Sequence, residues 1–444
     1  MTSLLFANGR IVNEGLIREA DLLIVDDRLE RIGTGRIPAR TRVVDLKGLY
    51  VLPGLIDDQV HFREPGLTHK ATIASESLAA ICGGVTSYLD MPNNSPPCID
   101  RAGLTAKKAI AARTSFANYG FYLGATNTNL EEIRAVTRAD ACGIKVFMGA
   151  STGNMLVDDE RALERIFADA TLPIATHCED TPLIRAAEAR ARAKYGDDVP
   201  MAEHPNIRSA EACYKSSALA VSLAKRHDAR LHVLHLTTAR ELELFSAGAL
   251  ERKRVTAEVC AHHLWFDDSG YARLGAKIKC NPAIKTAEDR AALIAAVNSD
   301  VIDVIATDHA PHTAEEKARR YFDAPSGLPL VQHMLNMLLD QHHAGVFSLE
   351  AIATKTAHNP ARLFGIENRG FIREGYFADL VVVDLAATTT VTAQQIRYKC
   401  AWSPFAGHTF RSAVVMTVLG GQVVFERGVV APRPLGAELI FLGA

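Results

Sequence analysis

Apolar and polar positions alternate along the first 50 residues in a pattern typical of short β-strands. Four apolar segments are separated by Gly, Asn and Asp, which favour turns: LLFANGRIV, ADLLIVDD, RLERIG and TRVVDL. This part of the chain is therefore predicted to form a small sheet.

From residue 51 onward, apolar runs alternate with stretches of helical periodicity. Eight runs are predicted to be strands: VLPGLIDDQVHF, VTSYLD, YGFYLGA, GIKVFM, LPIATHC, RLHVLHL, RVTAEVC and VIDVIATD. Helical periodicity is clearest at 70–84, 158–170, 208–228 and 286–299. Strands that alternate with helices are usually parallel, and eight such units indicate an α/β fold with a closed, TIM-like (β/α)8 barrel.

Strand-like segments return near the end of the chain, at 370–385 and 413–431. They are predicted to join the N-terminal strands in a small accessory β-sheet domain beside the barrel. Residues 1–52 would then be the N-terminal part of the sheet domain, 53–365 the barrel, and 366–444 the C-terminal part of the sheet domain.

Composition excludes several classes of function. The 444 residues include 48% hydrophobic and 23% charged positions, a normal globular mixture, and the net charge of -2 offers no basic excess for binding nucleic acid. No apolar run is long enough to span a bilayer, and the N-terminus has no basic leader before an apolar stretch, so a cytoplasmic location is expected. The eight scattered cysteines form no CxxC pair, so neither disulfides nor a thiolate zinc site is expected.

Residues able to bind metal occur where the predicted strands end. Lys145 lies in the fourth strand, and His61, His177, His235 and Asp308 close the first, fifth, sixth and eighth. In a barrel, these strand ends meet at one face. Three imidazoles and a carboxylate suit zinc. Burial would favour the neutral amine of the lysine, which can add carbon dioxide to form a carbamate that bridges two metals.

Each of these residues also has a purely structural interpretation. A histidine at the end of an apolar strand is often a hydrogen-bonded core residue, and His232 and the pair His262–His263 are interpreted in this way. Asp308 alone could cap a helix, and Lys145 alone could extend its amine to solvent or form an ion pair. Five such coincidences at one face are a poorer explanation than a metal site.

Six motifs, taken in order, resemble those of one family. They are GLIDDQVHFREPGLTH, DMPNNSPPCID, GIKVFMGASTGNM, HCED, ATDHAPHTAEEK and GYFADLVVVD. Together they resemble dihydroorotases, which are cyclic amidohydrolases of the metal-dependent amidohydrolase superfamily. The resemblance extends from about Pro53 to Asp384.

The resemblance implies a zinc-dependent enzyme that reversibly cyclises N-carbamoyl-L-aspartate to L-dihydroorotate in pyrimidine biosynthesis. The matching motifs imply one or two zinc ions and the following ligands: His61, carbamylated Lys145, His177, His235 and Asp308, with Asp308 also catalytic. They imply four substrate-binding residues: Arg63, Asn93, Asn281 and His312. A homo-oligomer is also expected.

Two positions depart from the family pattern. Gln59 stands where the first histidine of an HxH pair is usual, so the more exposed metal should bind less firmly or be absent. Lys285 stands where many relatives have arginine, so a bidentate contact would be lost. The segment from Ala314 to Gly327 is a candidate to close over the site.

Two alternatives remain open. One is a hydantoinase or allantoinase, which opens a ring without this carboxylate. The other is a non-catalytic partner of aspartate transcarbamoylase, which only Gln59 favours. Because the other ligands and the substrate-binding set are present, the sequence favours an active enzyme.

Overall fold

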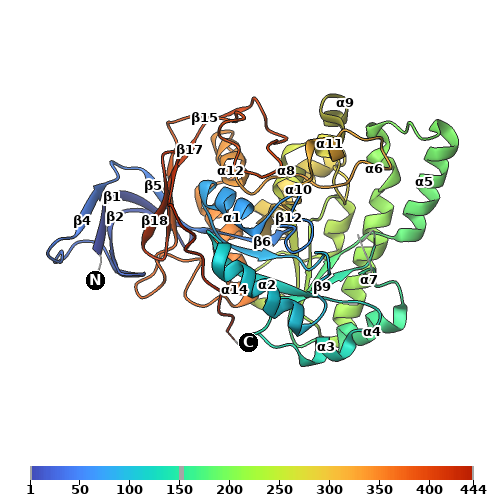
Figure 1. Cartoon of the computed structure of the whole chain (residues 1–444), viewed down its shortest axis with the longest axis horizontal. Helices are drawn as coiled ribbons and strands as arrows, with labels where there is room; N and C mark the ends of the chain where they lie inside the picture. Colours follow the sequence, from blue (N-terminus) through green and yellow to red (C-terminus); the bar gives the residue numbers. More distant parts are fainter. Residues whose placement is uncertain (1–2, 150–154, 443–444) are drawn as a thin grey trace.

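Eight parallel strands form a barrel in the computed structural model, which describes residues 3–149 and 155–442 (Figure 1). The strands are β6 (Leu55–Val60), β7 (Val85–Asp90), β8 (Asn118–Gly124), β9 (Gly143–Phe147), β10 (Ile174–His177), β11 (Leu231–Val233), β12 (Val255–Cys260) and β13 (Val304–Ala306). They are hydrogen-bonded in chain order. The first and last strands meet where the His61 N–H donates to the His309 carbonyl at 2.7 Å, so the (β/α)8 fold predicted from the sequence is confirmed. Residues 150–154 of the motif GIKVFMGASTGNM lie outside the described residues.

Helices cover the outside of the barrel. Those between strands are α1 (Ile73–Cys82), α2 (Arg101–Thr114), α3 (Leu130–Ala135), α4 (Glu160–Asp169), α5 (Thr181–Tyr195), α6 (His204–Ile207), α7 (Ala210–His227), α8 (Ala261–Trp265), α9 (Tyr271–Leu274) and α10 (Ala287–Asn298). After β13 come α11 (Ala314–Lys317), α12 (Met334–His343), α13 (Leu349–Ala353) and α14 (Asn359–Phe364). The connection from β11 to β12 contains two 3-10 turns, Arg240–Leu244 and Leu250–Arg252, in place of a helix.

The barrel strands are apolar because both of their faces are covered. Every residue in them except Val255 is buried. Strands buried in this way give continuous apolar runs, which is the pattern that made them recognisable in the sequence. Polar side chains inside such strands therefore need a specific explanation.

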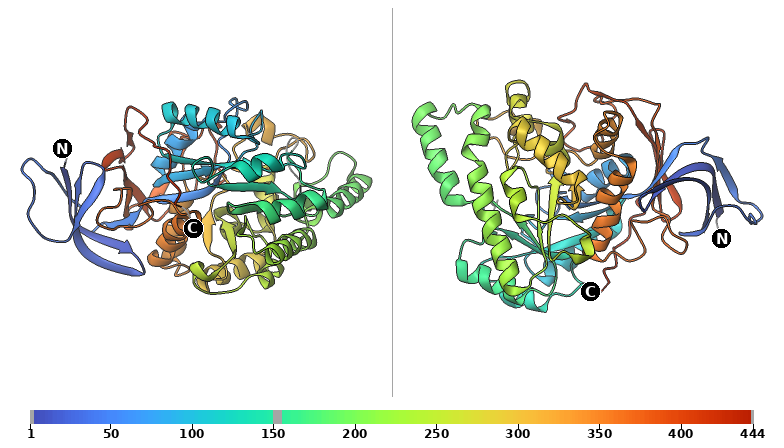
Figure 2. Two further views of the ribbon diagram at one scale, coloured as in Figure 1. Left: turned by 90° about the horizontal axis from the view of Figure 1, so that it is seen from below. Right: turned by 180° about the vertical axis from the view of Figure 1, so that it is seen from behind.

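A second sheet of nine strands is built from both ends of the chain. Its strands are β1 (Ser3–Asn13), β2 (Leu16–Val25), β3 (Arg28–Ile32), β4 (Arg42–Asp45), β5 (Tyr50–Pro53), β14 (Leu380–Asp384), β17 (Ala413–Leu419), β18 (Gln422–Glu426) and β19 (Val429–Val430). The N-terminal strands and the C-terminal strands lie side by side at one end of the molecule (Figure 2). A separate pair, β15 (Thr389–Thr390) and β16 (Thr409–Phe410), lies nearby in the chain.

The run VLPGLIDDQVHF, predicted to be one strand, is divided between the two sheets. Strand β5 pairs with β1 and β14, whereas β6 begins two residues later in the barrel. The break is at Gly54, whose N–H donates to the Asp379 carbonyl at 2.9 Å. A Cβ at this position would lie 2.3 Å from the side chain of Thr86, so the crossing requires glycine.

The last described residues return to the barrel. The Tyr119 N–H donates to the Ala437 carbonyl, and the Leu442 N–H donates to the Gly365 carbonyl. Among the helices in residues 3–149 and 155–442, none is both long and apolar enough to cross a membrane.

Candidate functional site

One cavity of about 160 Å³ lies at the carboxyl ends of the barrel strands. All nine residues singled out in the sequence line it: His61, Arg63, Asn93, Lys145, His177, His235, Asn281, Asp308 and His312. Gln59, Phe147, Ala310 and residues 325–327 complete the wall. The structure therefore brings together side chains that are up to about 250 positions apart in the chain, as the barrel topology requires.

The backbone is unusual at three of these residues. Arg63, His235 and Asp308 have φ angles of 67°, 41° and 48°, in the left-handed region that residues with a Cβ seldom adopt. Such conformations cluster at functional sites, because the surrounding structure must hold them in place. The strand pattern carried no signal of them.

His61 and Asp308 face each other in a way that suits a cation. The His61 Nδ1–H donates to Oδ1 of Asn93 at 2.6 Å, so in the tautomer with one ring hydrogen Nε2 presents its lone pair. This nitrogen lies 3.0 Å from Oδ1 of Asp308. The Gln59 amide donates to the same oxygen at 3.2 Å. A ring nitrogen with a lone pair and a carboxylate oxygen repel each other at this distance, and a positive charge between them would stabilise the contact.

His177 and His235 form a second pair, joined by a hydrogen bond. The His177 Nε2–H donates to Glu179 at 2.9 Å, and Arg208 contacts the same carboxylate oxygen at 2.5 Å. Nδ1 of His177 therefore accepts a hydrogen bond from Nε2–H of His235, 3.0 Å away. Nδ1 of His235 is buried without a hydrogen-bonding partner. A histidine that binds metal through one ring nitrogen usually donates the N–H of the other to a carboxylate or a carbonyl, as His177 donates to Glu179.

Burial keeps both rings neutral. Burial lowers the pKa of His177 and lowers that of His235 well below its usual value. Burial alone would raise the pKa of Glu179, but Arg208 and then His177 hold it at about 2. Sequence reasoning missed Glu179, although its place two residues after His177 in HCED could have indicated a shared orientation.

Lys145 lies in the wall of the cavity. Its Nζ is 4.6 Å from the centre of the Phe147 ring, and within the described part of the chain no hydrogen bond or ion pair fixes it. Burial lowers its pKa to about 8, with Asp308 opposing the shift. The neutral amine is thus accessible, as formation of a carbamate requires.

The predicted ligand set fits a metal centre only when Lys145 takes part. Within the described residues, no three of His61, His177, His235 and Asp308 bring ligand atoms within 4.8 Å of one another. They form two pairs, and Lys145 interacts electrostatically with His177 in one and Asp308 in the other. A carbamate on Lys145 would supply the anionic oxygens that join the pairs.

Another part of the cavity is suited to an anion. Arg63 is buried, donates to the Pro311 carbonyl at 3.1 Å, and makes no ion pair with a carboxylate in the described residues. Burial lowers its pKa to about 10, so it stays charged at neutral pH. A buried, unpaired guanidinium is costly unless an anion joins it.

Two further polar side chains, His312 and Asn281, line the cavity. Nδ1 of His312 accepts a hydrogen bond from Lys70 at 3.0 Å. Burial, then Arg63 and Lys70, lower the pKa of His312 well below its usual value, so the ring is neutral. Oδ1 of Asn281 is buried without a hydrogen-bonding partner.

A model of the amidohydrolase family matches residues 50–424. The chain belongs to the amidohydrolase family. Its similar proteins include a dihydroorotase of Methanothermobacter thermautotrophicus, 34% identical over 91% of this chain and 90% of that protein. An allantoinase of Solibacter usitatus is 32% identical, over 99% of this chain and 97% of that protein. The solved L-hydantoinase of Arthrobacter aurescens has a TM-score of 0.94 and 28% identity, covering 99% of this chain and 100% of its own.

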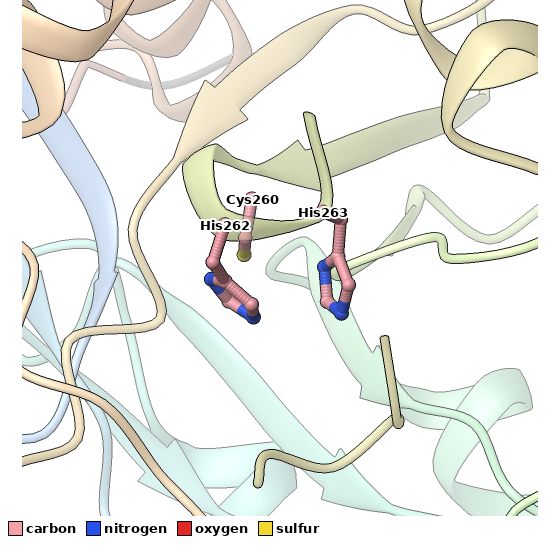
Figure 3. Close-up of side chains that lie close together, drawn as sticks. All are labelled: Cys260, His262 and His263. Carbon is pink, nitrogen blue, oxygen red and sulfur yellow. The ribbon is translucent and has the colours of Figure 1, made fainter. Parts of the chain in front are cut away.

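In this amidohydrolase, two other groups of side chains have the spacing of metal ligands: Cys260, His262 and His263 (Figure 3), and Asp58, His232 and Glu258. The interpretation of these three histidines as hydrogen-bonded core residues is right for their burial and only partly right for their hydrogen bonds. They are buried, but Nδ1 of His263 and Nε2 of His232 have no hydrogen-bonding partner. Neither nitrogen of His262 makes a hydrogen bond of normal geometry, although the Thr307 carbonyl approaches the ring.

Proposed function

We propose that this amidohydrolase is a dihydroorotase, which reversibly cyclises N-carbamoyl-L-aspartate to L-dihydroorotate in pyrimidine biosynthesis. The observation that carries the proposal is the buried Arg63, which has no carboxylate partner in the described residues and lines the same cavity as the predicted metal ligands. The planar guanidinium can bind a carboxylate through two hydrogen bonds, and both reactants carry one beside the reacting amide.

His177, His235 and a carbamate on Lys145 would hold one zinc ion, and His61, Asp308 and the same carbamate would hold a second, weaker one. Zinc supplies Lewis-acid activation of water and of the amide carbonyl. The amide of Gln59 donates to Asp308 and is a poor ligand, which supports weaker binding at the second position.

Asp308 would move the proton in both directions. Its Oδ1 contacts Gln59 and His61, so Oδ2 would accept a proton from water during ring opening and return it to the departing nitrogen. Arg63, with Asn93 and His312, would orient the substrate carboxylate, while Asn281 would contact the ring.

A second candidate is an allantoinase or hydantoinase, which the similarity to proteins of those names supports. These substrates lack the carboxylate beside the reacting amide, so they would leave Arg63 unpaired. A third candidate is a non-catalytic partner of aspartate transcarbamoylase. We also expect the protein to form a homo-oligomer, which light scattering would test.

The deciding experiment is a turnover assay of the purified protein with L-dihydroorotate, N-carbamoyl-L-aspartate, hydantoin and allantoin, together with its metal content. We expect turnover of the first two only, and its loss in Asp308→Asn. Turnover of hydantoin or allantoin alone would overturn the proposal. A protein with no zinc and no turnover in either direction would establish the non-catalytic alternative.

A further inference from the structure

Asp58, His232 and Glu258 form a polar cluster inside the barrel, apart from the cavity just described. They come from β6, β11 and β12, and none of them is more than 1% exposed. Nε2 of His232 lies 3.2 Å from Oδ2 of Asp58 and 3.6 Å from Oε2 of Glu258. None of the three lines the cavity that contains Arg63 and His177.

Hydrogen bonding determines which nitrogen of His232 faces the carboxylates with a lone pair. The Thr256 hydroxyl donates to the Leu231 carbonyl at 3.1 Å, so it accepts from Nδ1–H of His232 at 2.8 Å. In the neutral ring, Nε2 then has no hydrogen. It points its lone pair at two carboxylates, which is repulsive unless a positive charge lies between them.

The two carboxylates draw positive charge to this place. Burial lowers the pKa of His232, but Asp58 and Glu258 raise it to about 9, and burial raises the pKa of Glu258. A protonated His232 would donate to Oδ2 of Asp58 and would still leave Oδ1 of Asp58 without a partner. Buried carboxylates that are ionised and incompletely paired cost several kcal/mol, so without a cation the cluster must take up protons.

We propose that Asp58, His232 and Glu258 bind a divalent cation of the zinc class as a structural site inside the barrel. Two carboxylates and a neutral imidazole balance the charge of such an ion and are ligands that it prefers. A tetrahedral ion with bonds of about 2.1 Å separates its ligand atoms by about 3.4 Å. The separations of 3.2 and 3.6 Å around Nε2 lie on either side of that value.

The ion would also support the catalytic side of the barrel. The other oxygen of Glu258, Oε1, accepts the backbone N–H of His235 at 3.0 Å. His235 has a φ of 41° and lies in the wall of the cavity. A cation that fixes Glu258 thereby helps to hold the backbone at this strained position.

Anomalous diffraction tests the site directly. Crystals of the full chain grown with zinc chloride would be measured above and below the zinc absorption edge. We expect a peak about 2.1 Å from each of the three ligand atoms, separate from any peak beside His177. A peak in the cavity with none among Asp58, His232 and Glu258 would show that the cluster holds only a proton, and would overturn the proposal.

Metal analysis of variants provides a second test that does not depend on activity. The double variant His177→Ala/His235→Ala should retain one tightly bound zinc per chain. Adding Asp58→Asn should remove it, whereas adding Asp57→Asn should not, because the Asp57 carboxylate accepts from Thr307. Circular dichroism would confirm folding. Equal zinc in the Asp58 and Asp57 series, or none in the double variant, would contradict the proposal. Dihydroorotate turnover by the wild type is unaffected by either outcome, so the two proposals fail separately.

Discussion

At the scale of single residues, the cavity combines one permanent cation with several neutral rings. Arg63 keeps its charge because burial lowers its pKa only to about 10, while His177, His235 and His312 are neutral because burial lowers theirs. Neutral imidazoles can bind metal, and a charged guanidinium cannot. The side chains of the cavity are thereby separated by charge into groups that can bind metal and a group that can bind an anion.

This separation predicts the effect of Arg63→Ala. The KM for dihydroorotate should rise about 10- to 100-fold, equivalent to about 1.4–2.8 kcal/mol, because the substrate carboxylate loses its charged partner. Zinc content should not change, since Arg63 contacts no predicted ligand. Steady-state kinetics and elemental analysis measure both effects. Arg63→Lys is the matched control. Its KM should lie between those of the wild type and Arg63→Ala, because lysine keeps the charge but loses the planar guanidinium group. A metal-free variant would refute the assignment.

The lowered pKa of Lys145 predicts how carbamate formation depends on pH. Burial lowers this pKa from 10.5 to about 8, so the neutral amine predominates above pH 8 and falls tenfold per unit below it. At a fixed concentration of dissolved carbon dioxide, recovery of activity after decarbamylation should therefore speed up about eightfold from pH 6.5 to 7.5 and level off well above pH 8. Recovery rates that do not change with pH over this range would contradict the prediction. Lys145→Ala, the control, should not recover at any pH.

At the scale of helices and strands, the sequence predicted the barrel but not how its segments are held. Runs such as VTSYLD were recognisable because strands buried on both faces are continuously apolar. The break at Gly54 could not be recognised in this way. It depends on the pairing of β5 with β1 and β14, which are distant from it in the chain. Strand ends likewise predicted which side chains meet in the cavity. Their orientation depends on distant partners, such as Asn93 for His61, that no local pattern reveals.

The segment from Ala314 to Gly327, predicted to close over the site, is held by two buried lysines: Lys279, which donates to the carbonyls of Tyr321 and Ala324, and Lys317. Nζ of Lys317 donates to the carbonyls of Lys279, Pro325 and Gly327 at 2.9–3.0 Å. Pro325 and Gly327 line the cavity. Lys317 therefore fixes part of the cavity wall from behind.

Lys317→Met should loosen this wall. Three carbonyls would lose their donor, so the free energy of unfolding should fall by about 2–4 kcal/mol and KM should rise more than kcat falls. Urea unfolding and steady-state kinetics measure the two effects. Lys277→Met, at an exposed lysine of the neighbouring segment, is the control and should behave as the wild type. Unchanged stability and KM in Lys317→Met would show that the wall is held by other contacts.

At the scale of the whole molecule, the accessory sheet and the barrel are joined through Asp379. Its Oδ2 accepts from the Asn118 amide of β8 at 3.0 Å and pairs with buried Arg369. Its Oδ1 accepts the N–H of Gly420, between β17 and β18, at 2.7 Å. Its backbone carbonyl accepts the Gly54 N–H at the crossing from one sheet to the other. One residue therefore contacts the barrel, the sheet and the segment that links them.

Asp379→Ala should weaken this junction without altering the cavity. Removing the carboxylate leaves the Arg369 charge buried and unpaired, so the free energy of unfolding should fall by about 3–5 kcal/mol in urea titrations followed by circular dichroism. Asp384→Ala is the control, because its carboxylate lies at the other end of β14 and, among the residues that the structure describes, accepts only a local N–H from Ala386. Zinc content and KM of the folded variant should match the wild type, since Asp379 does not line the cavity. A loss below about 1 kcal/mol would mean that apolar packing, and not this ion pair, joins the sheet to the barrel.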